Sequence, residues 1–154
     1  MIQLLIPPEI RSRLIRALAQ AGRQEIGGIL MGEHVGPETF RVRDLTVQRT
    51  AGTFAAFVRI VGELIAPLRV FFERTNHDYR KFNYLGEWHS HHSFALSPSR
   101  TDHATMHEMV MDPQVGANFA VLLLVKLFNG NQLEGSITVY QPNQSPTGGV
   151  LVPE

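Results

Sequence analysis

Apolar residues recur at helical spacing in two stretches of the chain. Over residues 8–21 they form one stripe of an amphipathic helix, whose Pro-Glu start and following Gly22 are typical helix-end residues. Over residues 60–76 the same spacing predicts a second helix, which Pro67 either kinks or begins. Each helix needs an apolar surface to pack against.

Shorter apolar runs bounded by turn residues predict strands that supply this surface. The runs cover residues 2–6, 25–31, 40–47, 82–88, 119–128 and 133–140. Asn129-Gly130, between the last two runs, predicts a β-hairpin. Residues 51–57 fit neither pattern.

A third helix is expected between the strands at 82–88 and 119–128. Ser97 is its expected N-cap, Pro98 its first residue, and about Met111 its end. Helices and strands thus alternate before a closing hairpin, which predicts an α/β (mixed α+β) fold with helices on both faces of a mixed sheet.

The pattern indicates one domain, residues 1–140, followed by a C-terminal tail, residues 141–154. The tail is rich in Pro, Gly and polar residues, and we expect it to be loosely held. Its short apolar segment, residues 150–152, is a candidate edge strand.

Composition narrows the possible functions. The 154 residues include no cysteine, which excludes disulfide scaffolds, thiolate zinc fingers, iron–sulfur clusters and thiol proteases. Fourteen basic residues balance fourteen acidic ones, so no overall charge favours nucleic acid or an anionic membrane as partner. No signal peptide or transmembrane run is recognisable, and the expected location is the cytoplasm.

One stretch has the spacing of a metal site: His89-Ser90-His91, then seven residues, Ser99, two residues and Asp102. Histidines at i and i+2 of a strand end point to the same face. Asp102 falls in the first or second turn of the following helix, one turn after Ser99. Two imidazoles and a carboxylate, with water in the fourth position, are a recurrent ligand set of catalytic zinc.

Hydrolysis at such a site also needs a base and an oxyanion donor. Glu25 is a candidate base, because a carboxylate entering an apolar strand needs a partner. Glu87 is its rival, since at i−2 it points to the same face as His89, and spacing alone leaves the choice open. Ser99, near a helix N-terminus, is a candidate donor of a hydrogen bond to an oxyanion and a candidate cap of the helix, and the two roles can coexist.

Together these residues resemble the JAMM motif of the MPN+ (JAB-type) zinc metalloproteases: Glu, His-Ser/Thr-His, seven residues, Ser, two residues, Asp. The segments at residues 25–32 and 86–91 also resemble compact prokaryotic JAB domains, and the resemblance covers essentially the whole chain. It implies a mixed sheet sandwiched by helices, similar to cytidine deaminases.

The resemblance also implies roles. Its zinc ligands are His89, His91 and Asp102, its acid/base is Glu25, and its oxyanion donor is Ser99. The implied activity is zinc-dependent hydrolysis of an isopeptide or peptide bond at the C-terminus of a ubiquitin-like protein, in deconjugation or maturation. Alternatives are a zinc amidase for small peptides or small molecules and a non-catalytic MPN scaffold.

Three further histidines bear on the site. The family usually has Pro after the second motif histidine, where this chain has His92, which we expect on the substrate rim or simply exposed. His103 and His107 have the i, i+4 spacing of a zinc pair, but no carboxylate completes them as well as Asp102 completes the first set. A solvated helix face is the favoured interpretation.

Overall fold

The centre of the molecule is a nine-stranded mixed sheet. The structure is a computed structural model that describes residues 1–49, 61–92, 95–113 and 115–154, with the backbone alone for residues 61–65. The strand order is β8-β7-β6-β5-β2-β3-β1-β9, and β4 pairs with β2. The strands are β1 (Gln3–Ile6), β2 (Ile26–Gly36), β3 (Thr39–Leu45), β4 (Gln48–Arg49), β5 (Phe82–Ser90), β6 (Ala120–Phe128), β7 (Gln132–Tyr140), β8 (Thr147–Gly148) and β9 (Val150–Pro153). The helices are α1 (Pro8–Ala21), α3 (Val61–Arg74) and α4 (Arg100–Met111).

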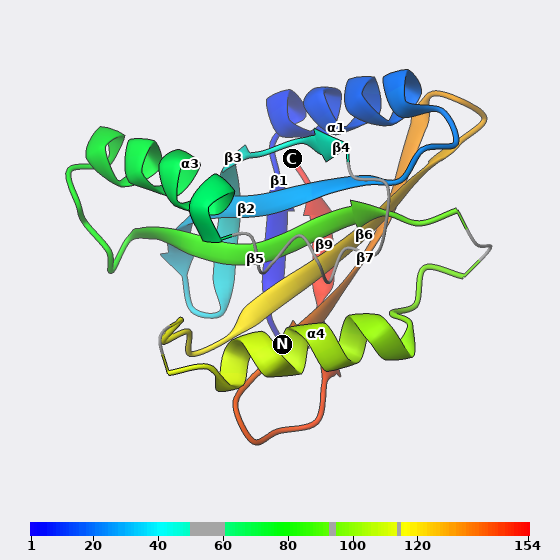
Figure 1. The fold of residues 1–154 in the computed structure, drawn as a ribbon. Coiled ribbons are helices and arrows are strands. Elements are labelled where there is room, and N and C mark those ends of the chain that lie inside the picture. Colours follow the sequence, from blue (N-terminus) through cyan, green and yellow to red (C-terminus); the bar gives the residue numbers. More distant parts are fainter. Residues whose placement is uncertain (50–60, 93–94, 114) are drawn as a thin grey trace.

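The helices cover both faces of this sheet, as predicted (Figure 1). On one face, α1 buries Ile10, Leu14 and Leu18 in the largest apolar cluster. On the other face, α4 buries Met106, Met109 and Val110 against β6 and β7, while Phe71 of α3 packs on Ile29 and Met31 of β2. Residues of β5 and β6 alternate between the two clusters, so both strands are buried on both faces.

The predicted hairpin is confirmed. β6 and β7 pair antiparallel over their whole length, and Asn129 and Gly130 both have positive φ, at 52° and 75°. Positive φ at both central residues is what a type I′ turn requires. The structure thus accounts for the Asn-Gly pair.

The beginning of α4 differs from the prediction. Its N-cap is Ser99 rather than Ser97, and Pro98 precedes the helix. The difference arises because Ser99 has Asp102 three residues later, which completes a reciprocal capping box. Pro67 lies inside α3 rather than at its start. Residues 51–57 lie outside the described part of the chain.

The C-terminal residues belong to the sheet, which corrects the expectation of a loosely held tail. β9 pairs in parallel with β1, and β8 pairs with β7, so the chain end links both edges of the sheet. Leu151 packs against the core, and Glu154 forms a salt bridge with Arg41 at 2.8 Å. The expected strand at 150–152 is therefore β9. None of the helices in the described ranges is long and apolar enough to span a membrane.

Candidate metal centre

The antiparallel pairing of β2 with β5 brings Glu25 towards the paired histidines. Gly27 of β2 lies opposite His89 of β5, and Glu25 directly precedes β2, two residues before Gly27. The Glu25 side chain is exposed, and its charge acts to raise the pKa of His89. The carboxylate therefore lies in the neighbourhood of the motif histidines.

Two glycines allow this close strand packing. A Cβ on Gly28 would lie 2.0 Å from the Thr46 carbonyl oxygen, which accepts a 2.8 Å hydrogen bond from Trp88 Nε1. A Cβ on Gly86 would lie 1.9 Å from the Val121 carbonyl oxygen, and Gly86 has φ +148°. A larger residue at Gly28 would push the Thr46 segment away from β2, and a larger residue at Gly86 would push β6 away from β5.

Ser90 ties the two strands together on the opposite face. Its buried hydroxyl accepts a 3.0 Å hydrogen bond from the backbone N–H of Ile26, the residue after Glu25. The His91 N–H donates to the Val125 carbonyl at 2.9 Å, which continues the pairing with β6 by one residue. Ser90 has no role of its own in the predictions from the sequence. The sequence did contain a signal for this role: Ser90 lies between two histidines that point to the same face of the sheet, so its own side chain must point to the opposite face.

The start of α4 brings in the carboxylate. Asp102 Oδ2 accepts from the Ser99 N–H at 2.8 Å, and Ser99 Oγ accepts from the Asp102 N–H at 3.1 Å. The other carboxylate oxygen, Oδ1, lies 3.7 Å from His89 Nε2. The carbonyl of Leu96, three residues before Ser99, accepts a hydrogen bond from the Ser136 hydroxyl. The capping box thus orients Asp102 with one oxygen towards His89.

Burial favours the neutral form of His89. It lowers the pKa of the imidazole, the neighbouring His91 lowers it further, and the charges of Asp102 and Glu25 oppose these effects. The two rings lie nearly parallel, with centroids 6.1 Å apart. A neutral imidazole is the form that binds a metal ion.

The His89–Asp102 pair fits zinc in type and spacing. Metal–ligand bonds of 2.0–2.2 Å in a tetrahedral site put ligand atoms about 3.4 Å apart, close to the observed 3.7 Å between Nε2 and Oδ1. Among the described side chains, however, no group of three or more His, Cys, Asp or Glu residues is close enough to hold a metal ion. The structure therefore brings two of the three expected ligands close together, and metal binding by His89, His91 and Asp102 remains a prediction.

The comparisons with known proteins identify the family. Residues 7–136 match the family of prokaryotic homologs of the JAB domain. The chain belongs to this family. No match was found among curated proteins. The solution structure of protein DSY2949 from Desulfitobacterium hafniense is similar in fold, with a TM-score of 0.66 and 14% identity over 98% of this chain and 92% of that one.

Within this JAB domain, Glu87 occupies a buried position beside the motif rather than at its open side. Its side chain is 1% exposed, and neither carboxylate oxygen has a hydrogen-bond partner within the part of the chain that is described. Burial raises its pKa to about 8; the Tyr84 hydroxyl opposes the rise, and the charge of Asp102 adds to it. That hydroxyl makes its own hydrogen bond to Met109 Sδ at 3.1 Å, and the pKa of Tyr84 is raised too, by burial and by Glu87. Of the two carboxylates considered as base, Glu25 is thus the one open to solvent.

The three further histidines considered with the site, His92, His103 and His107, each have their own surroundings. His92 is exposed and lines a cavity of about 430 Å³ that also adjoins His91, between the end of α1 and the β6–β7 hairpin. His103 and His107 do not lie on a fully solvated face, because both are half-buried against the buried Tyr140. His103 Nδ1 is 2.9 Å from the Tyr140 hydroxyl, whose pKa is raised by burial and by Asp102.

Proposed function

We propose that this JAB domain is a zinc metallopeptidase that hydrolyses the isopeptide or peptide bond at the C-terminus of a ubiquitin-like protein. The observation that carries the proposal is the approach of Asp102 to His89, in the neighbourhood of Glu25, from three segments of the chain. The ubiquitin-like substrate rests on the resemblance of the motif. A cytoplasmic location, without nucleic-acid or membrane partners, is part of the same proposal.

We assign each residue its role in the proposed reaction from its surroundings. A bound zinc ion supplies Lewis-acid polarisation of the scissile carbonyl and a water of lowered pKa. In this proposal His89, His91 and Asp102 hold the ion, and the Ser99 N–H keeps Asp102 in its rotamer. Glu25, at the open side, takes the proton of the attacking water and returns it to the leaving amine.

Ser99 combines both roles considered for it. Its oxygen accepts the capping hydrogen bond from the Asp102 N–H, and within the described residues no acceptor takes its hydroxyl proton, which can therefore be donated. That proton stabilises the oxyanion as the carbonyl becomes tetrahedral.

The first test is the metal content of freshly purified protein. We expect about one zinc per chain in the wild type and in Glu25→Gln, and little in His89→Ala and Asp102→Asn. The Asn variant is chosen because its side-chain oxygen can still accept the capping hydrogen bond. A loss of bound zinc in this variant therefore reports the loss of a metal ligand and not a loss of helix stability. His77→Ala, at an exposed histidine outside the motif, is the matched control. Zinc retained in both ligand variants would refute the assignment.

The second test is turnover. Glu25→Gln with zinc bound should lose cleavage of a ubiquitin-like fusion by about 10²-fold or more, since general acid–base catalysis contributes on that scale. Full activity of this variant would contradict the role of Glu25. Cleavage of a dipeptide amide without cleavage of the fusion would favour the small-peptide amidase, and a zinc-loaded but inert wild type would favour the scaffold.

A further inference from the structure

A second cavity lies at the opposite end of β5 from the histidines. Its volume is about 530 Å³, within the range of small-molecule sites. It is lined by the start of β5, the residues before β6, and parts of β2 and β3. Asn83, in its wall, is six residues before His89, which corresponds to about 20 Å along a strand. The cavity is therefore separate from the candidate metal centre.

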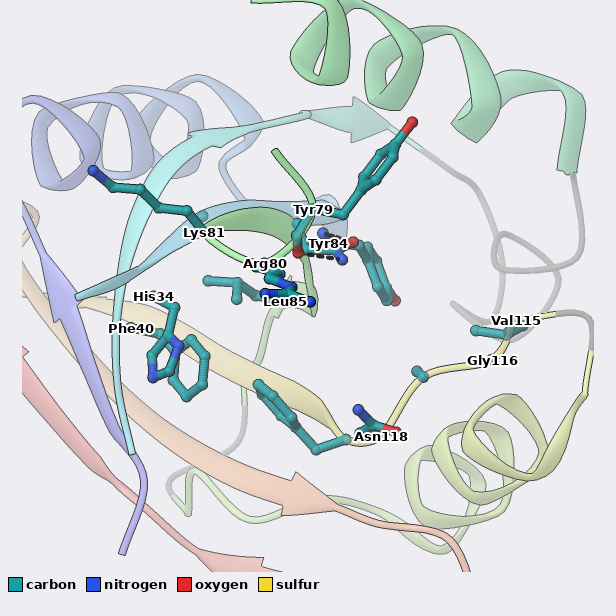
Figure 2. A pocket seen from close by; sticks show the side chains of 14 residues that line it. His34, Phe40, Tyr79, Arg80, Lys81, Tyr84, Leu85, Val115, Gly116 and Asn118 are labelled. Atoms are coloured by element: carbon teal, nitrogen blue, oxygen red, sulfur yellow. Dashed lines mark hydrogen bonds between the residues drawn. The ribbon is translucent and has the colours of Figure 1, made fainter. Parts of the chain in front are cut away.

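One wall of this cavity is aromatic and anchored in the core. The rings of His34 and Phe40 stack with their centroids 4.8 Å apart. The ring of Phe40 also packs against that of Phe119, with the two centroids 4.9 Å apart. Phe40 and Phe119 are half-buried against the main apolar cluster, whereas His34 is exposed. Figure 2 shows His34 and Phe40 side by side along the cavity, with Asn118 on another side of it. A fixed aromatic surface of this kind favours a flat ring as ligand.

The polar groups of the lining favour an anion. Among the described residues that line it, Arg80 and Lys81 are the fully charged ones, and none is Asp or Glu. Lys81 extends away from the cavity in Figure 2, and its Nζ lies 3.7 Å from Glu33. Within the described residues the guanidinium of Arg80 makes no hydrogen bond or ion pair, and the side-chain amide of Asn118 makes no hydrogen bond. The cavity thus presents an uncompensated cation.

The carboxylate of Glu33, which lies beside the cavity, is already paired with other cations. The Glu33 carboxylate has three cations within 4.0 Å: Arg41 at 3.9 Å, Arg43 at 3.7 Å and Lys81 at 3.7 Å. The negative charge of Glu33 is therefore shared among these three cations, and it does not neutralise Arg80. A ligand with a carboxylate or phosphate group would supply the missing charge, because a guanidinium binds both in a planar, bidentate geometry.

We propose that this cavity binds a small organic anion with a flat ring, its ring against Phe40 and Phe119 and its carboxylate or phosphate on Arg80. Asn118 donates a further hydrogen bond to the anion. This site is independent of the metal and of the proposed peptidase activity.

The test uses the isotope-labelled full chain and amide chemical shifts in solution. Benzoate and adenosine monophosphate are the two ring-bearing anions, and they distinguish a carboxylate from a phosphate ligand. Benzamide and adenosine are the matched neutral compounds, and acetate and inorganic phosphate are the anions without a ring. We expect saturable shifts with at least one ring-bearing anion at residues 32–34, 79–85 and 115–119, and weaker binding of the other four compounds.

Variants make the test specific. Arg80→Ala should weaken binding about ten- to hundredfold, as expected for loss of a hydrogen bond to a charged group, and Arg80→Lys should bind less tightly than the wild type. Arg16→Ala, at an exposed arginine of α1, is the matched control and should bind as the wild type does. The proposal is overturned if neither ring-bearing anion causes saturable shifts at millimolar concentration, if binding survives Arg80→Ala, or if acetate and phosphate bind as tightly.

Discussion

The buried carboxylate of Glu87 predicts an unusual pH dependence of stability in the metal-free protein. Its folded-state pKa is raised from 4.5 to about 8, so the folded protein holds a proton that the unfolded chain releases above pH 4.5. Stability therefore falls as pH rises from 4.5 to 8, because the folded state binds more protons than the unfolded state in that window. At 1.36 kcal/mol per unit, the whole shift corresponds to about 5 kcal/mol.

Glu87→Gln removes this titration while keeping the shape of the side chain. The free energy of unfolding of wild type minus variant should therefore decrease by about 2.5 kcal/mol between pH 5 and pH 7. An imperfect fit of the amide would add a pH-independent offset, so the slope and not the absolute difference carries the prediction. Glu87 is not among the charges that set the pKa of His89, so the His89 contribution is expected in both proteins.

The measurement is urea unfolding at several pH values between 5 and 8, in the presence of a chelator, for both proteins. The chelator removes any bound metal, which would otherwise change the charge near Glu87. A difference between the two proteins that does not vary with pH would mean that Glu87 is charged in the folded state. That result would refute the reasoning from burial.

Two further substitutions test the packing around the site. Gly28→Ala should prevent stable folding or cost several kcal/mol, because its Cβ would lie 2.0 Å from the Thr46 carbonyl oxygen; Gly148→Ala, with open space around it, should change the melting temperature little. Ser99→Ala should cost about 1 kcal/mol, or about 2–4 °C in melting temperature, through loss of the capping hydrogen bond. Ser97→Ala is its matched control, and an equal loss in both variants would mean that the capping box contributes nothing specific.

Local patterns in the sequence were sufficient for most of the elements. The stripe of apolar residues defined α1, and the Asn129-Gly130 pair defined the hairpin, because each depends on residues only a few positions apart. The start of α4 was predicted two residues early, since Ser97-Pro98 also suits a helix start. Only the reciprocal bonds between Ser99 and Asp102 distinguish the two positions.

The C-terminal segment shows why composition alone was misleading. Its Pro, Gly and polar residues resemble those of a loose tail, yet residues 150–153 pair with β1 near the other end of the chain. Parallel pairing between segments so distant in sequence has no local signal, because the partner strand is selected by the packing of the whole sheet.

The sequence by itself determined the family, the alternation of helices and strands, and the residue types available for metal chemistry. These follow from the order and spacing of side chains, which no folding step changes. The tertiary structure alone decided which groups are buried and which lie close together across the chain. It decided that Glu87 is enclosed while Glu25 is open, that Asp102 lies beside His89, and that Arg80 faces a cavity whose described lining includes no carboxylate. Burial and neighbouring charges set the pKa values of these groups and the kind of ligand that a cavity favours. Burial and neighbouring charges arise only when distant segments of the chain pack together.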